Sequence, residues 1–223
     1  GFTASATSQF LGLEKFSFAL TGKIDMNFPN MGKMILLGIL FGVVGGAFAW
    51  TLKYMKKKFA QTWKQPVIRI FIIGLILSVL LLLLYKGRYA GLGTNLIHAS
   101  FYGEDILSYD WILKFLLTIV TLAAGFQGGE VTPLFSIGAS LGAVIAPVLG
   151  VPVEIAAALG YAGVFGSATN TFLAPVLIGT EVFGFSYLPH FFVVCAFAYL
   201  FNLNKSIYSL QKIMDGHNGY QKP

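Results

Sequence analysis

The sequence has little charge and almost no cysteine. Only 11% of its 223 residues are charged, and 9 acidic residues stand against 15 lysines and arginines. One cysteine, Cys195, excludes a disulfide within the chain, and its apolar neighbours indicate a small buried side chain. Hydrophobic residues make up 56% of the chain and the mean hydropathy is +0.75, which is more apolar than one soluble core of this size requires. The composition therefore predicts a membrane protein.

Sequence patterns of enzymes and metal sites are also missing. No glycine-rich phosphate loop and no Ser-His-Asp pattern occurs, so we expect neither an enzyme nor a cofactor. His98 and His190 lack the spacing of metal ligands, and we expect them to be interfacial or hydrogen-bonded. The chain begins without methionine and without the pattern of a signal peptide, so we expect it to be a piece of a longer protein.

Positive charge gathers beside a hydrophobic segment. Residues 53–64, KYMKKKFAQTWK, include five lysines directly after an apolar run. In a soluble protein the net charge of +6 would suggest nucleic acid, but lysines beside a membrane span set its topology. We therefore expect no nucleic-acid binding, and we place this segment and the tail beyond Tyr208 on the cytoplasmic side.

Three apolar stretches predict membrane crossings. They are Met34–Trp50, Val67–Leu84 and Trp111–Gly125. In the first stretch, Gly38 and Gly42 form a GxxxG pair. Small residues four positions apart let two helices approach closely within lipid, so we expect another helix to pack on this face.

From 126 to 202 the chain stays apolar but is interrupted at short intervals. Each apolar piece is shorter than the roughly 20 residues that cross a bilayer, so we expect half-helices at 133–148, 152–166, 172–183 and 189–201. Irregular backbone at membrane depth must be buried in protein or line a polar cavity. Breaks at QGGEVTP, GSATNT and NLNKS therefore predict a site built from broken helices. Long apolar runs in place of alternating residues indicate an all-α fold and exclude a membrane β-barrel.

The first of these breaks carries an acid, Glu130, within AAGFQGGEVTPLFSIGASLG. Thr132 fits an N-cap and Pro133 fits the first helical position, so we expect a helix to begin just beyond Glu130. The amides near Glu130, Val131 and Thr132, together with the positive end of the helix dipole, would form a cradle for a small anion. The glycine pair ending at Gly129 would let the backbone approach that anion without a Cβ in the way.

A carboxylate at this place has two uses. Ionised Glu130 competes with an anion, whereas protonated Glu130 donates a hydrogen bond to one, which predicts coupling to protons. The alternative is that Glu130 pairs with a structural partner. Among the other polar residues, we expect Glu181 to pair with a polar group on a neighbouring helix. We expect Ser167, Thr169 and Asn170 to cap two half-helices.

A tyrosine near the C-terminus offers a second donor. In FNLNKSIYSLQKIMDGH, Asn204 or Ser206 is expected to cap a short helix that ends near Gly216, with Tyr208 in or near its first turn. The Tyr208 phenol would then donate a hydrogen bond to the anion. The alternative is that Tyr208 is an aromatic anchor at the membrane interface.

The order of these segments resembles the second half of the CLC chloride channel and transporter family. GGEVTP, the apolar half-helices and NKSIYS follow the family's order, in which the anion-site segment reads Gly-x-Phe-x-Pro. LGILFGVVGGAF, GLGTNLI and APVLIGTEVFG are similar to the family's glycine-rich helix, mid-chain loop and penultimate broken helix. The resemblance implies an all-α polytopic membrane protein with broken and re-entrant helices. Residues 1–223 would form the C-terminal half, or second inverted repeat, of the transport domain.

Carried over residue by residue, the resemblance implies an anion-binding and proton-coupling site at Glu130, Thr132, Tyr208, Val131 and Gly129. Tyr208 would close this site from the inside. Glu130 and Thr132 stand where chloride-type members have apolar residues, which resembles the fluoride-selective bacterial branch. The family's gating glutamate lies in a Gly-Arg/Lys-Glu-Gly-x segment of the first half, and Glu130 lacks that pattern. We therefore expect the gate to lie outside this chain and this chain alone not to transport.

The implied function is a fluoride/proton antiporter that exports fluoride across the bacterial cell membrane. Its implied partners are fluoride, protons, the lipid bilayer, the missing N-terminal half and a second copy in a homodimer. A chloride/proton antiporter or a passive anion channel of the same family is the alternative. An intramembrane enzyme would need a second catalytic group, and none is visible. A non-transporting scaffold would tolerate replacement of Glu130, Thr132 and Tyr208.

Overall fold

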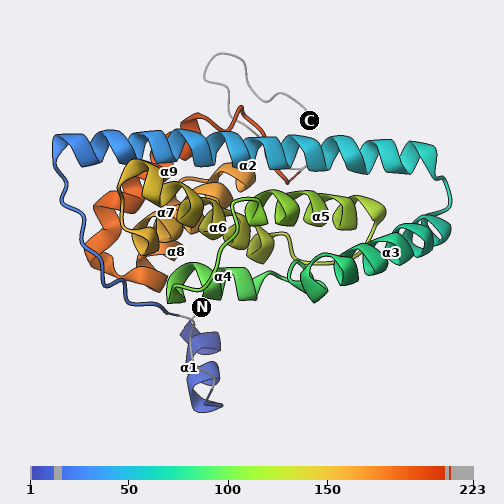
Figure 1. Ribbon diagram of the computed structural model, residues 1–223, viewed down its shortest axis with the longest axis horizontal. Coiled ribbons are helices and arrows are strands. Elements are labelled where there is room, and N and C mark those ends of the chain that lie inside the picture. Colours follow the sequence, from blue (N-terminus) through green and yellow to red (C-terminus); the bar gives the residue numbers. More distant parts are fainter. Residues whose placement is uncertain (1, 13–16, 209–210, 212–223) are drawn as a thin grey trace.

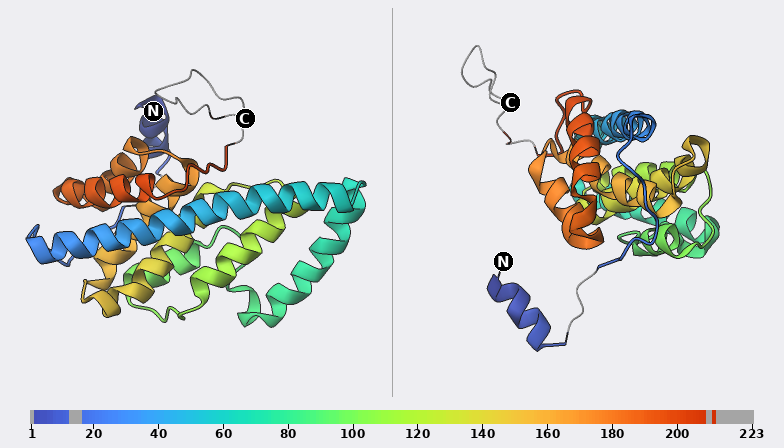
Figure 2. Two further views of the ribbon diagram at one scale, coloured as in Figure 1. Left: turned by 90° about the horizontal axis from the view of Figure 1, so that it is seen from above. Right: turned by 90° about the vertical axis from the view of Figure 1, so that its left-hand side faces the viewer.

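A computed structural model describes residues 2–12, 17–208 and 211, and within them the protein is built of helices without strands (Figure 1). The predicted all-α fold class is confirmed. α1 lies apart from the other helices (Figure 2). The helices are α1 (Phe2–Phe10), α2 (Phe28–Thr62), α3 (Pro66–Leu83), α4 (Thr94–Tyr102), α5 (Asp110–Ala124), α6 (Val131–Leu149), α7 (Val153–Thr169), α8 (Leu173–Phe183) and α9 (Leu188–Leu200), with short 3-10 turns η1 (Tyr85–Gly87) and η2 (Phe185–Tyr187).

α2 is a single helix of 35 residues that runs the length of the molecule (Figure 1). The side chain of Asn27 caps its first turn by accepting a hydrogen bond from the Asn30 amide at 3.0 Å. The helix contains the predicted span Met34–Trp50 and continues through the lysine-rich segment 53–64 almost to its end. At 1.5 Å per residue it is roughly 52 Å long, compared with a hydrocarbon layer of about 30 Å. If α2 crosses this layer upright, its lysine-bearing end therefore lies outside the layer. Its whole length would fit inside the layer only if the helix were steeply tilted.

Glycines let α2 pack directly on α9, as the sequence predicts. A Cβ placed on Gly38 would come within 2.8 Å of the Val194 carbonyl oxygen, and one on Gly42 within 2.9 Å of the Ala198 carbonyl oxygen. Real Cβ atoms do not approach backbone oxygens this closely, so only glycine fits at this crossing. The hydroxyl of Ser167 adds a hydrogen bond of 2.6 Å from α7 to the Gly42 carbonyl oxygen.

α6 and α7 form an antiparallel pair at the centre of the molecule, and every residue from Ile155 to Thr169 is buried. Their backbones touch at small residues. A Cβ on Gly138 would lie 2.0 Å from the Gly160 carbonyl oxygen, and one on Gly142 would lie 2.1 Å from the Ala156 carbonyl oxygen. The antiparallel arrangement brings the N-terminus of α6 and the C-terminus of α7 to the same end of the pair.

Two of the three predicted crossings form helices with the length and composition of a membrane span, and the third forms a shorter helix. Among the described residues, three helices are long and apolar enough to cross a membrane by length and composition, namely α2, α3 and α6. The stretch Trp111–Gly125 forms most of α5, which has 15 residues and contains the buried charged residues Asp110 and Lys114. The expected half-helix 133–148 is instead the 19-residue α6, because the helix begins two residues before 133 and ends one residue after 148. The predicted half-helices that follow are confirmed as α7, α8 and α9.

Smaller predictions have mixed outcomes. Asn170 ends α7 in a left-handed conformation with φ of 53°, but Ser167 bonds to α2 instead of capping a helix. Thr169 donates to the Phe165 carbonyl oxygen within its own helix, so the capping prediction holds for Asn170 alone. His98 contacts Glu104 at 3.1 Å and a ring nitrogen of His190 lies 2.9 Å from the Ile24 carbonyl oxygen, which confirms the expectation for both. Cys195 is buried with its thiol free, also as predicted.

Candidate functional site

Glu130 lies where the chain enters α6 after the break formed by Phe126–Gly129. It is the N-cap residue, and the first hydrogen bond into the helix runs from the Leu134 amide to the Glu130 carbonyl oxygen at 3.3 Å. The predicted N-cap at Thr132 is therefore wrong, since Thr132 and Pro133 lie within the first turn. Proline is tolerated at any place in that turn because the first N–H groups of a helix have no intrahelical partner. The amides of Val131 and Thr132 remain at the positive end of the helix, as the predicted anion cradle requires.

The carboxylate of Glu130 forms an ion pair with Lys56 of α2. Lys56 Nζ lies 2.9 Å from Glu130 Oε1, and their side chains are 46% and 20% exposed, respectively. Exposed pairs of this kind contribute little to folding, about 0–1 kcal/mol. Sequence reasoning read the lysine cluster as a topology signal only and missed Lys56 as a partner of the acid. No local sequence pattern can signal an ion pair between two residues that are 74 positions apart.

A cavity of about 290 Å³ opens beside this ion pair. Lys56, Arg69, Gln127, Gly128 and Glu130 contribute its polar lining. The guanidinium of Arg69 is held in place because its Nε donates a hydrogen bond of 2.8 Å to the Ala124 carbonyl oxygen at the end of α5. Two cations and one acid therefore line this cavity, so its lining carries a net positive charge even with Lys56 paired to Glu130.

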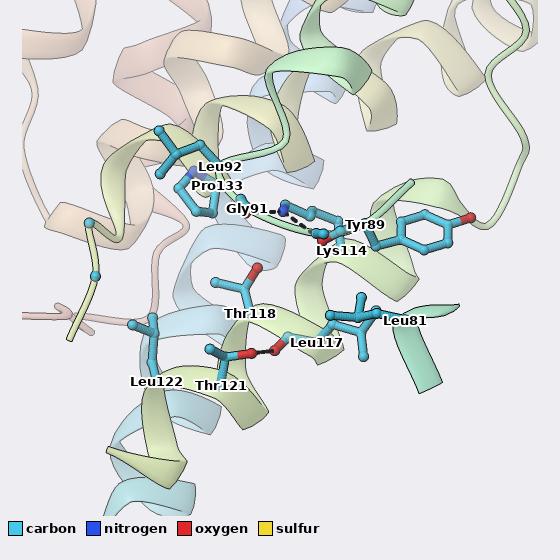
Figure 3. A pocket seen from close by; sticks show the side chains of 13 residues that line it. Leu81, Tyr89, Gly91, Leu92, Lys114, Leu117, Thr118, Thr121, Leu122 and Pro133 are labelled. Carbon is cyan, nitrogen blue, oxygen red and sulfur yellow. Dashed lines mark hydrogen bonds between the residues drawn. The ribbon is translucent and has the colours of Figure 1, made fainter. Parts of the chain in front are cut away.

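A second cavity, of about 250 Å³, is also lined by Gly128. Figure 3 shows this cavity from close by. Gly129 and Pro133 line it, and so does Lys114 of α5. A Cβ on either Gly128 or Gly129 would meet no atom within 4 Å, so these glycines keep space open and are not required by packing. The predicted open approach to the backbone at Gly129 is therefore present.

Lys114 is a buried cation that sequence reasoning did not identify. Its side chain is only 1% exposed, and its ammonium donates to the carbonyl oxygens of Tyr89 at 3.0 Å and Gly91 at 2.7 Å. Figure 3 shows it pointing at this turn, with Leu92 and Pro133 nearby. An isolated lysine in the apolar run DWILKFLL is the signal that could have identified it, since buried lysines require partners.

An ion-pair cluster fixes the turn that Lys114 contacts. Asp110 is fully buried and accepts hydrogen bonds from Arg88 at 2.6 and 3.2 Å and from the Tyr89 hydroxyl at 2.6 Å. Burial, reinforced by the neighbouring Asp110 carboxylate, raises the pKa of the Tyr89 phenol. Tyr89 therefore remains a hydrogen-bond donor at neutral pH. The cluster anchors the start of α5 and the wall of the second cavity.

Tyr208 lies in the segment that follows α9 and folds back over the end of α7. The Ile207 amide donates to the Ala168 carbonyl oxygen at 2.9 Å, and the Ser206 hydroxyl donates to the Thr169 carbonyl oxygen at 3.2 Å. The side chain of Tyr208 is 48% exposed, and residues 205–208 are not helical. The predicted helix therefore does not begin at Asn204 or Ser206, and its predicted end near Gly216 lies outside the described residues.

The segment before Tyr208 and the start of α6 lie at the same end of the α6–α7 pair. The start of α6 and the end of α7 are neighbours, and the segment before Tyr208 covers the latter. A further cavity of about 120 Å³ is lined by Lys53, Lys56, Ser206 and Ile207, among others. Lys56 therefore borders both the cavity of Glu130 and the cavity beside the Tyr208 segment.

Several known proteins are similar to this chain. The family described as voltage-gated chloride channel matches residues 1–203. A chloride/fluoride channel protein of Pseudomonas syringae pv. tomato is 31% identical over 226 residues, which cover 99% of this chain and 49% of that protein. The H(+)/Cl(-) exchange transporter ClcA of Vibrio cholerae is 28% identical over 118 residues, which cover 51% of this chain and 25% of that protein.

Two solved structures are also similar. A crystal structure of a CLC-type fluoride/proton antiporter matches with a TM-score of 0.91 and 56% identity, covering 93% of this chain and 52% of that one. A slow cyanobacterial Cl−/H+ antiporter matches with a TM-score of 0.73 and 22% identity, covering 91% and 51%, and this likeness shows the fold alone. The chain spans about half the length of these relatives. It is a multi-pass helical membrane protein that belongs to the voltage-gated chloride channel family.

Proposed function

We propose that the complete protein is a fluoride/proton antiporter that exports fluoride from the cytoplasm of a bacterial cell. This chain would supply the second half of the anion pathway. The observation that carries the proposal is the acid at the start of α6. Glu130 lines a polar cavity together with the cationic side chains of Lys56 and Arg69. The similarity to a fluoride/proton antiporter at 56% identity and to a chloride/fluoride channel protein at 31% identity supports it.

The geometry suggests how fluoride would be held. Fluoride is the halide that accepts the strongest hydrogen bonds, so it needs donors to replace its hydration shell. The amides of Val131 and Thr132 supply donors at the positive end of α6, and Gly129 leaves the space in front of them open. The hydroxyls of Thr132 and Tyr208 would add further donors when the first half of the protein encloses the site.

Proton coupling would come from Glu130. In its protonated form the carboxyl donates a hydrogen bond to fluoride, and in its ionised form it repels the anion and pairs with Lys56. A group that binds a proton in one step and releases it in another ties the movement of one ion to that of the other. Glu130 would act together with a gating glutamate outside this chain, and the acid would perform no enzymatic chemistry.

The rest of the assembly is proposed on the same resemblance. Residues 1–223 would be the C-terminal half of the transport domain, joined to a first half that carries the gate. The complete protein would work as a homodimer in the cell membrane, with the lysine-rich end of α2 on the cytoplasmic side. That two halves are joined stays a prediction, as does the homodimer.

A chloride/proton antiporter is the second candidate. The similarity to the H(+)/Cl(-) exchange transporter of Vibrio cholerae favours it, although that match covers only 51% of this chain. Glu130 and Thr132 argue for fluoride, because polar donors at both positions suit the halide with the strongest hydrogen bonds.

Transport by the complete protein in liposomes separates these candidates. An outward fluoride gradient should drive protons inward, as measured with a fluoride electrode and a pH electrode together. An equal chloride gradient should drive little proton movement. Proton movement driven by chloride but not by fluoride would support the second candidate, and halide flux without proton movement would indicate a passive channel.

A further inference from the structure

One lysine of the cluster on α2 is distinguished from the others by its surroundings. Lys56 borders two cavities, of about 290 and 120 Å³, and its ammonium lies 2.9 Å from the carboxylate of Glu130. Lys57 and Lys58 line neither cavity, and Lys58 instead lies over the ring of Tyr54 at 5.8 Å. Successive residues of a helix point about 100° apart, so the backbone itself turns these neighbours away from Lys56.

The charged side chains around Glu130 show which cation changes partner when this acid is protonated. Lys56 of α2 and Arg69 of α3 line the cavity of Glu130, and Lys53 lines the adjoining one. Arg69 is already engaged with the Ala124 carbonyl oxygen through Nε. Lys56 is therefore the cation whose partner changes when Glu130 gains or loses a proton.

Protonation of Glu130 would change the charge of this pair. The ionised acid and Lys56 together carry no net charge, so they attract an anion weakly. A protonated Glu130 no longer neutralises Lys56, and the ammonium then faces the cavity with a full positive charge. The pair is partly exposed, with side chains 46% and 20% exposed, and such pairs separate at little cost. Binding of one proton to Glu130 therefore frees the ammonium of Lys56 to interact with one anion.

We propose that Lys56 is a positioning residue for the exchange, which pairs with ionised Glu130 and is released to the incoming anion when Glu130 is protonated. This inference rests on the proposed function, in that it assumes an anion enters the cavity beside Glu130. It adds a residue outside the predicted anion site and gives it a definite role. Proton binding and anion binding favour one another because both separate the same ion pair, and by linkage the effect is reciprocal.

The test is the halide affinity of the complete protein as a function of pH, measured by titration calorimetry with fluoride and, in parallel, with chloride. Wild-type protein should bind fluoride more tightly as the pH falls. Lys56→Gln should weaken binding about tenfold at low pH and flatten the pH dependence, since coupling factors of this kind are typically 5–150-fold. Lys57→Gln makes the same chemical change one residue away and should leave both properties unchanged. Lys56→Arg keeps the charge and should restore most of the affinity.

The outcomes separate this inference from the proposed function. Identical halide affinity and pH dependence in Lys56→Gln and Lys57→Gln would overturn the role of Lys56. The proposal of fluoride transport would be unaffected by that result. Binding of chloride but not fluoride by the wild type, weakened by Lys56→Gln alone, would refute the fluoride assignment and support Lys56. Absence of binding of either halide to the wild type would overturn both. Thermal unfolding of each variant in detergent distinguishes a local effect from loss of the fold.

Discussion

At the scale of single residues, Lys114 and Glu130 hold their charges in different ways. Lys114 is 1% exposed and its ammonium binds two carbonyl oxygens of the turn at Tyr89–Gly91. Glu130 is less buried, and its ion pair with Lys56 lies at the edge of a cavity. The first arrangement is suited to a permanent structural contact. The second is suited to one that breaks and forms again.

Lys114→Met should destabilise the protein. Methionine has a similar length and can fill the space, but the carbonyl oxygens of Tyr89 and Gly91 then lose their donor. A buried polar group left unsatisfied costs about 1–3 kcal/mol, so the unfolding temperature in detergent should fall. Lys57→Met removes an exposed lysine and serves as the control. Equal unfolding temperatures for the two variants would show that Lys114 is not a structural donor.

Tyr208→Phe should weaken fluoride binding by the complete protein without disturbing the fold. The substitution removes one hydroxyl donor and keeps the ring. A neutral hydrogen bond contributes about 0.5–1.5 kcal/mol, which corresponds to about a two- to twelvefold loss of affinity in titration calorimetry. An unchanged affinity would favour the alternative that Tyr208 is an interfacial anchor.

At the scale of helices, close contacts at glycines set the arrangement. α6 and α7 touch through Gly138 and Gly160, and α2 touches α9 through Gly38 and Gly42. The second contact was predicted from its GxxxG spacing. The first was not, because small residues are frequent in every apolar segment here and only packing shows which ones face a partner. The extent of α2 was also underestimated, since lysines continue a helix as readily as they end a membrane span.

Gly138→Ala should separate α6 from α7. Its Cβ would lie 2.0 Å from the Gly160 carbonyl oxygen, so one of the two backbones must move. Overpacking of this kind typically costs about 1–3 kcal/mol, and we expect a lower unfolding temperature and loss of folded protein on size exclusion. Gly32→Ala in α2, where a Cβ would meet no atom within 4 Å, is the matched control and should be tolerated. If both variants behave like the wild type, the close helix contact is not essential.

At the scale of the whole molecule, the sequence was sufficient to predict a helical membrane fold with broken helices around an acid. Hydropathy reports burial in lipid or protein, and Gly, Pro and Asn mark the breaks at Gly129 and Asn170. The sequence alone could not predict the pairing of Lys56 with Glu130 or the anchoring of Lys114, because both contacts join residues that are far apart in the chain. Such contacts depend on how the helices pack, which local patterns do not encode.

Topology can be tested through the lysine-rich end of α2. Cysteines introduced at Lys57 and at Asn218 should react with a membrane-impermeant thiol reagent only from the cytoplasmic side, because lysines beside a span remain in the cytoplasm. Asn218 lies outside the described residues, so its position is a prediction from sequence. The native Cys195 is buried and should give little background. Reaction of either cysteine in intact cells with the reagent outside would contradict the orientation.

The measurement that tests the central claim most directly is transport by Glu130→Gln in the complete protein. Glutamine keeps the size of the side chain and a hydrogen-bond donor but cannot exchange a proton. In liposomes followed with fluoride and pH electrodes together, the variant should still bind fluoride but lose, or severely slow, the coupled exchange. Glu154→Gln, the same change at an acid that instead accepts a hydrogen bond from Thr21, should exchange like the wild type. Wild-type rates of both fluxes in Glu130→Gln would contradict the account and leave Glu130 a structural acid.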